Sequence, residues 1–252
     1  MRLTVPLVAL VLPAAWAGEG QKEPAQNGGG TVTGVVEWKG EKPAPEELKQ
    51  VLGHAFCKEA CGGKAPAKET FVLGKNGDLA TLQNVLVYVA KGLEGKKFEV
   101  PKAPVVLDQV ACVYTPHVVA LMVGQTLEVR NSDATLHNVM STPFNNRPFN
   151  DGMPVKGGKI EKVFKNPELK VSLRCFLHPW MEAFVHVIDH PFHAVTAADG
   201  SFTIRGLPPG GYELAVVHES SRIKADVPTV TVKVAAGETK KVGFVYQMPQ
   251  GK

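Results

Sequence analysis

The heptapeptide Cys175-Phe176-Leu177-His178-Pro179-Trp180-Met181 decides the fold. It follows residues 169–175, in which apolar and polar side chains alternate as they do in a half-buried β-strand. Cys175 leaves this strand in the register that faces the core, and the tight loop after it can bring His178 and Met181 around the same point. The stretch therefore predicts a strand that ends in a cluster of one thiolate, one imidazole and one thioether.

A second histidine must complete such a cluster, because ligands from one loop cannot encircle a metal ion alone. The segment Asn131-Ser132-Asp133-Ala134-Thr135-Leu136-His137-Asn138 supplies it, directly after a predicted strand at 126–130. Soft sulfur suits Cu(I) and imidazole suits Cu(II), so this donor set predicts a type 1 (blue) copper centre. Its predicted ligands are His137, Cys175, His178 and Met181. Because three strong ligands and one weak one leave no position open for a substrate, we expect one-electron transfer rather than an enzyme.

The Cys-x2-His-Pro-x-Met loop and the preceding Gly-Gln-x5-Asn-x-Asp-x3-His-Asn segment resemble the cupredoxin family, in particular its amicyanin- and plastocyanin-like members. The resemblance covers residues 101–190 and implies a Greek-key β-sandwich. It implies three equatorial ligands followed by a weak axial one, namely His137, Cys175, His178 and Met181. It also implies that Asn138 tethers the ligand loop and forms a hydrogen bond near the thiolate sulfur.

The segments before and after residues 101–190 resemble a second family. Residues 198–204 and 206–214, together with Gly30-Thr31-Val32-Thr33-Gly34-Val35-Val36, resemble the carboxypeptidase-regulatory-like domain, a small β-sandwich that also occurs in rhamnogalacturonan lyases. We expect one such sandwich from residues 31–100 and 191–247, split by insertion of the copper domain. The alternative is an elaborated cupredoxin followed by a separate small domain. Carbohydrate binding would follow from this resemblance alone, and no residue of the chain supports it.

The composition is that of an all-β chain, because 25 glycines and 19 prolines separate short apolar runs. The pattern predicts one short helix at 46–52, loops at 57–68 and 142–158, and several hairpins. One hairpin joins 194–196 to 202–204, and another joins 230–234 to 242–246. The lysines and arginines are scattered and the net charge is +4, which argues against a nucleic-acid partner.

The remaining cysteines are Cys57, Cys61 and Cys112. If Cys175 binds metal, this odd number permits one disulfide and one spare thiol. We expect the Cys57–Cys112 disulfide, which would pin the irregular loop around Cys57 to the copper domain, and Cys57–Cys61 is the competing pair. Alternatively, His54-x2-Cys57-x3-Cys61 could form a second copper site. His117, His190 and His193 are further candidates for an additional metal site, although a structural role is the interpretation that we favour.

The first residues predict export. Arg2, the apolar run 3–12 and Ala15-Trp16-Ala17 form a signal peptide over residues 1–17, followed by a flexible leader at 18–30. We therefore expect a secreted, periplasmic protein without a transmembrane segment, which exchanges electrons with an unidentified redox protein. A copper-binding accessory or interaction module without a shuttle role is the main alternative. An enzyme in which a ligand exchange opens the copper is the third.

Overall fold

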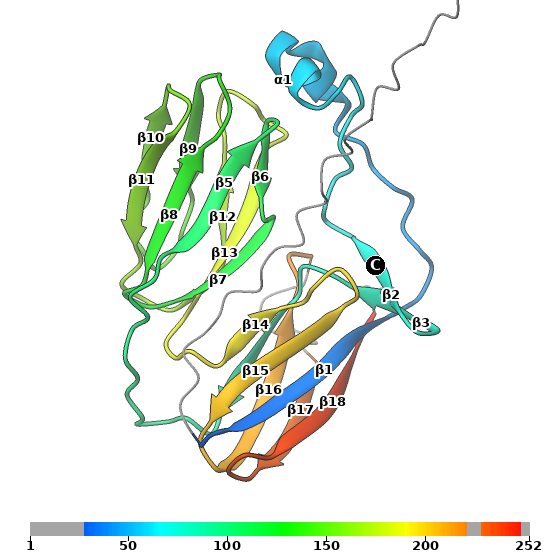
Figure 1. The fold of residues 1–252 in the computed structure, drawn as a ribbon, viewed down its shortest axis with the longest axis vertical. Coiled ribbons are helices and arrows are strands. Elements are labelled where there is room, and N and C mark those ends of the chain that lie inside the picture. The colour runs from blue at the N-terminus through cyan, green and yellow to red at the C-terminus, as the bar shows by residue number, and fades with distance from the viewer. Residues whose placement is uncertain (1–27, 221–227, 248–252) are drawn as a thin grey trace, which may run out of the picture.

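The computed structural model describes residues 28–220 and 228–247, and the regular elements of these residues are β-strands apart from one 3-10 turn and one short helix, as the composition predicts. The predicted signal peptide and residues 18–27 of the predicted leader lie outside this range. The strands form four sheets, which are stacked in pairs as two β-sandwiches (Figure 1). Within the described part of the chain, no helix is long and apolar enough to cross a membrane.

The first pair of sheets, which we call the central sandwich, uses only the middle of the chain. One sheet has the order β10-β9-β12-β13-β7, and the other has the order β11-β8-β5-β6. The pairs β7–β13 and β5–β8 are parallel, and the other neighbours are antiparallel. Its strands are β5 (Val105–Val110), β6 (Val113–Thr115), β7 (Val118–Met122), β8 (Thr126–Asn131), β9 (His137–Ser141), β10 (Asn150–Met153), β11 (Gly158–Val163), β12 (Glu168–Arg174) and β13 (Glu182–Ile188).

The second pair of sheets, which we call the flanking sandwich, uses strands from both sides of the central one. One sheet has the order β15-β1-β3-β2 with β18 also paired to β1, and the other has the order β14-β4-β16-β17. Its strands are β1 (Gly30–Lys39), β2 (Leu73–Asn76), β3 (Leu79–Leu82), β4 (Leu86–Lys91), β14 (His193–Val195), β15 (Ser201–Leu207), β16 (Gly210–Val217), β17 (Thr229–Val234) and β18 (Thr239–Gln247). Strand β1 therefore lies between the parallel β18 and the antiparallel β15.

Glycine at position 34 allows this close packing around β1. A Cβ atom there would lie 2.1 Å from the carbonyl oxygen of Val242 and 2.8 Å from the ring of Phe202. Both distances are shorter than any real contact, so only a residue without a side chain fits. This observation gives a physical reason for the second glycine in the segment Gly30-Thr31-Val32-Thr33-Gly34-Val35-Val36.

Two predicted hairpins are wrong, although their turns form. Gly200 has φ +72° and its N–H donates to Ala197 O, yet β14 pairs with β4 while β15 pairs with β1. Gly237 likewise reverses the chain with φ +66°, but β17 pairs with β16 and β18 with β1. Each turn crosses from one sheet to the other, because a turn signal fixes the local reversal and not the partner of the strand that follows.

Three further predictions need correction. The predicted helix at 46–52 is a 3-10 turn, η1 (Lys49–Gly53), and the predicted loop at 57–68 begins within helix α1 (Ala55–Ala60). The predicted loop at 142–158 contains β10 and the first residue of β11. Helix α1 and strands β10 and β11 are short, and residues 142–158 are rich in proline, asparagine and glycine, so local patterns favoured loops there.

A buried apolar cluster and an ion pair are among the contacts between the two sandwiches. Leu86, Ala120, Ile188 and Val217 are buried together at the interface. His117, just before β7, forms an ion pair with Glu219, just after β16, and both side chains are almost buried. Burial lowers the pKa of His117, but Glu219, together with Glu69 and the Glu182 backbone, raises it by more, so it lies above the ordinary 6.5. Burial raises the pKa of Glu219, but His117, together with Thr70 and His218, lowers it by more, so it lies below 4.5.

Candidate metal centre

The topology places three of the sequence-predicted ligands at one end of the central sandwich. Strands β12 and β9 are antiparallel, and Arg174 pairs with Met140. This register brings Cys175, at the end of β12, beside the first residues of β9, where His137 stands. His178 lies in the loop from β12 to β13. The sheet pairing therefore explains why residues so far apart in sequence meet.

The donor atoms of these three residues converge. The Nδ1 atoms of His137 and His178 are 2.9 Å apart, and Cys175 Sγ lies 3.6 Å from His178 Nδ1. One donor atom from each residue lies within 4.8 Å of the other two. All three side chains are buried. The cluster is therefore compact enough for one ion and is closed to bulk water.

Met181, the predicted axial ligand, ends the loop that carries His178. Its N–H donates to His178 O at 2.8 Å, and its carbonyl oxygen accepts from Cys175 N–H at 3.3 Å. The side chain is buried in the same hydrophobic core as Cys175. These bonds close the loop over residues 175–181 and hold Met181 next to the end of β12.

Asn138 ties the ligand loop to the neighbouring strands. Its backbone N–H points at Cys175 Sγ at 3.5 Å, and its Oδ1 accepts from the N–H of Phe176 at 2.6 Å. Its Nδ2 donates to Asn150 Oδ1 on β10 at 2.6 Å. The residue thus contacts the thiol sulfur and fixes the backbone that follows it.

Asp133 orients His137, a role that our sequence analysis did not assign. Its Oδ2 lies 2.9 Å from His137 Nε2, so the ring donates there and turns Nδ1 toward the other donors. The carboxylate also accepts from the N–H groups of Ala111 and Cys112, at 2.7 and 2.8 Å. Outer partners of this kind fix the tautomer and direction of a histidine ligand. The available signal was an aspartate four residues before His137.

The surroundings favour the charged form of the cysteine. Burial raises the pKa of the Cys175 thiol, but hydrogen bonds with His137, His178 and the Asn138 N–H lower it by more, to about 5. Burial also raises the pKa of Asp133, and its bonds with His137, Cys112 and Ala111 lower it below the ordinary value. At neutral pH the site therefore presents a thiolate, the form of cysteine that binds metals.

The predicted Cys57–Cys112 disulfide is confirmed, with Cα atoms 5.5 Å apart. Cys61 and Cys175 are free thiols. The competing Cys57–Cys61 disulfide therefore does not form. A copper site that needs both Cys57 and Cys61 as thiolates is also excluded, because Cys57 is already in a disulfide. Two further groups have metal-ligand spacing among the described residues, His54–Cys57–His178 and Cys112–Asp133–His137, but each contains a disulfide sulfur. Of the groups found there, only His137–Cys175–His178 has a free thiol.

The structure does not gather His117, His190 and His193 into a metal cluster, since no group with ligand spacing among the described residues includes them. His117 contacts Glu182 O and Glu219, and His190 contacts Val89 O and the N–H of Phe192. His193 is buried, and burial lowers its pKa. The burial and contacts of these histidines therefore fit the structural role that we favoured from the sequence.

Comparisons with known proteins found resemblance only among solved structures, because no family model and no curated protein matches the chain. A copper-containing nitrite reductase from Thermus scotoductus SA-01 is 21% identical over 40% of this chain, with a TM-score of 0.33. A purple cupredoxin from Nitrosopumilus maritimus is 26% identical over 32% of this chain, with a TM-score of 0.29. An amicyanin mutant in the Cu(I) form is 21% identical over 40%, with a TM-score of 0.31.

The extent of the match differs among these structures. The matched region spans 97% of the purple cupredoxin and of the amicyanin, but only 26% of the nitrite reductase. The donor geometry of this chain is the basis on which a function can be assigned.

Proposed function

We propose that this chain is a cupredoxin-type copper protein that transfers single electrons, with His137, Cys175 and His178 as ligands and Met181 as a weak axial ligand. The observation that carries the proposal is the convergence of one cysteine sulfur and two histidine Nδ1 atoms in a buried cluster. In this proposal, residues 101–190 are the copper domain and Asn138 holds its ligand loop.

The chemistry of the donors fits copper. A thiolate with two imidazoles and a weak sulfur ligand is typical of blue copper sites. The low pKa of Cys175 supplies the thiolate, and Asp133 leaves His137 Nδ1 free to bind. When bound at such a site, copper supplies a one-electron couple between Cu(I) and Cu(II).

The protein around the donors favours electron transfer over substrate turnover. The ligand residues are buried, and hydrogen bonds donated by the N–H groups of Asn138 and Met181, and one accepted by Asp133, hold their segments in place. Ligands held by such an outer shell keep their positions when the charge of the ion changes. The site therefore suits a reaction that needs no rearrangement and no open coordination position.

An exposed apolar surface lies beside the ligands and supports a protein partner. Leu136 precedes His137 and is 46% exposed, whereas Phe176 and Leu177 follow Cys175 and are 75% and 48% exposed. Large apolar side chains gathered on a surface commonly mark an interaction site. A redox protein that docks there would come close to the copper.

We further propose that residues 31–100 and 191–247 form a carboxypeptidase-regulatory-like sandwich into which the copper domain is inserted. The order of strands in the flanking sandwich supports this, because its sheets combine strands from both ends of the chain. We also propose export to the periplasm. The predicted signal peptide supports it, and so does the disulfide, since disulfides persist in oxidising compartments.

The alternative function is a copper-binding accessory module without a shuttle role. The observation that favours it is that His178 is only 2% exposed. A ligand ring that is covered in this way offers a docked partner no exposed edge of the metal site. In that case the flanking sandwich would provide the main interaction surface.

The visible spectrum and voltammetry of the copper-loaded protein test the proposal. We expect a strong thiolate-to-Cu(II) charge-transfer band and a reversible one-electron wave, both lost in Cys175→Ser. Cys61→Ser is the matched control, since Cys61 is the other free thiol, and it should keep both signals. A Cys175→Ser protein that keeps the band would refute the assignment. A colourless wild-type copper complex would favour the accessory module.

A further inference from the structure

A second segment reaches the metal centre from the flanking sandwich. The chain between β1 and β2 extends to the end of the central sandwich, where α1 lies (Figure 1). Val51 and Cys57, from this segment, are buried in the hydrophobic core that also contains Cys175 and Met181. The segment is therefore part of the wall of the site, although the cupredoxin resemblance does not include it.

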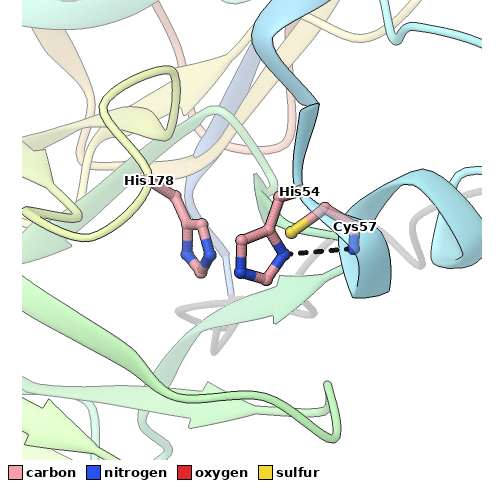
Figure 2. A group of neighbouring side chains, drawn as sticks. All are labelled: His54, Cys57 and His178. Atoms are coloured by element: carbon pink, nitrogen blue, oxygen red, sulfur yellow. Dashed lines mark hydrogen bonds between the residues drawn. The ribbon is translucent and has the colours of Figure 1, made fainter. Parts of the chain in front are cut away.

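The disulfide and one hydrogen bond fix His54 within this segment. Cys57 is joined to Cys112 in the turn between β5 and β6. The N–H of Cys57 donates to His54 Nδ1 at 3.5 Å, and Figure 2 shows the imidazole held at the start of α1 by this bond. His54 is thus linked through the disulfide to the turn whose N–H groups bind Asp133.

His54 packs against the ligand His178. The two ring centroids are 4.8 Å apart and the ring planes are perpendicular. Figure 2 shows the rings side by side, with the His54 nitrogen that is not bonded to Cys57 turned toward His178. His178 points its Nδ1 at His137 and Cys175, so His54 meets a different part of the ring.

Trp180 also packs against the ring of His178. Its ring centroid lies 5.1 Å from that of His178, and its Nε1–H donates to Cys112 O at 2.9 Å. The His178 ring is therefore packed between His137, Trp180 and His54. His54 is only partly buried itself, whereas His178 beside it is only 2% exposed.

We propose that His54 is a positioning residue for the copper ligand His178, holding its ring and keeping water from its outer edge. The proposal rests on the proposed copper function. Solvent access and outer contacts control both the reduction potential and the affinity of a metal site. Water at His178 would stabilise the more highly charged Cu(II), so loss of the His54 ring should lower the reduction potential.

Three substitutions at one position separate this role from a purely structural one. His54→Ala removes both the ring and the acceptor for the Cys57 N–H. His54→Asn keeps an acceptor suited to the start of a helix, and His54→Phe keeps a ring over His178. Lys58→Ala is the matched control, because Lys58 is exposed on the same helix.

We expect His54→Ala and His54→Asn to lower the reduction potential and to speed copper loss by about 10–100-fold, the usual cost of losing an outer partner. His54→Phe and Lys58→Ala should stay near wild type in both measurements. Thiol counts check that Cys57–Cys112 remains closed in each variant.

An unchanged potential and copper off-rate in His54→Asn would overturn the inference. If His54→Phe also lost copper faster than wild type in that case, only the hydrogen bond to Cys57 would matter, and not the ring. A wild-type protein without the charge-transfer band would instead refute the proposed function, so the two failures are distinguishable.

Discussion

Replacing Asp133 by asparagine tests how the protein orients His137. The carboxylate accepts three hydrogen bonds, from His137 Nε2 and from the N–H groups of Ala111 and Cys112. Asparagine keeps one acceptor oxygen and introduces an NH2 group, which must face at least one of these donors. An unsatisfied buried donor costs about 1–3 kcal/mol, so the metal-free protein should lose about this much unfolding free energy.

Copper binding adds a second, separable loss. Without the carboxylate the His137 ring has no fixed direction, and losing such a partner lowers metal affinity about 10–100-fold. This corresponds to about 1.4–2.8 kcal/mol, since each tenfold change is about 1.4 kcal/mol. The copper-loaded Asp133→Asn protein should therefore lose about 2–6 kcal/mol in total, because a ligand that binds only the folded state adds its affinity to the stability.

Denaturant unfolding of the metal-free and copper-loaded forms measures both losses, and a competition titration measures the affinity directly. Asp189→Asn is the control, since this carboxylate is 72% exposed and its substitution should change stability by less than about 0.5 kcal/mol. Equal losses in the two forms, with wild-type copper affinity, would refute the claim that Asp133 orients His137.

Two other predictions concern the disulfide and the contact between the sandwiches. Removing the Cys57–Cys112 bond, which closes 55 residues, should cost about 4 kcal/mol in denaturant unfolding by the loop-entropy relation, whereas Cys61→Ser should change little. The His117–Glu219 pair should stabilise fully between pH 4.5 and 6.5, because His117 has a raised pKa and Glu219 a lowered one. His117→Gln should therefore cost about 3–5 kcal/mol in that window and less as pH rises through the raised pKa of His117. A cost that is constant with pH would show that the pair does not carry this stability.

The sequence predicted the strands better than their partners. Alternation identifies β12, where Val171 and Leu173 are buried and Arg174 is exposed. The pairing of a strand depends on distant parts of the chain, since β1 pairs with β15 and β18, which lie more than 150 residues later in the sequence. No local pattern around Gly237 or Gly200 carries that information, which explains why the two predicted hairpins fail.

For the candidate site, too, the sequence identified some residues and missed others. Three of the four predicted ligands, His137, Cys175 and His178, meet in the fold, and the sequence could name them because their types and order match one kind of chemistry. His54 contacts His178 only because a disulfide brings a remote segment to the site. Asp133 contacts His137 directly, but its carboxylate is held by N–H groups from the turn between β5 and β6. Contacts of this kind depend on the folded arrangement, so spacing alone does not reveal them.

X-ray absorption at the copper edge of the copper-loaded protein tests the central claim most directly. If His137, Cys175 and His178 hold the ion, the spectrum should show two imidazole nitrogens and one short sulfur bond, and Cys175→Ser should lose that short bond while Cys61→Ser keeps it. A first shell of nitrogen and oxygen only in the wild type, or a short sulfur bond that persists in Cys175→Ser, would contradict the account.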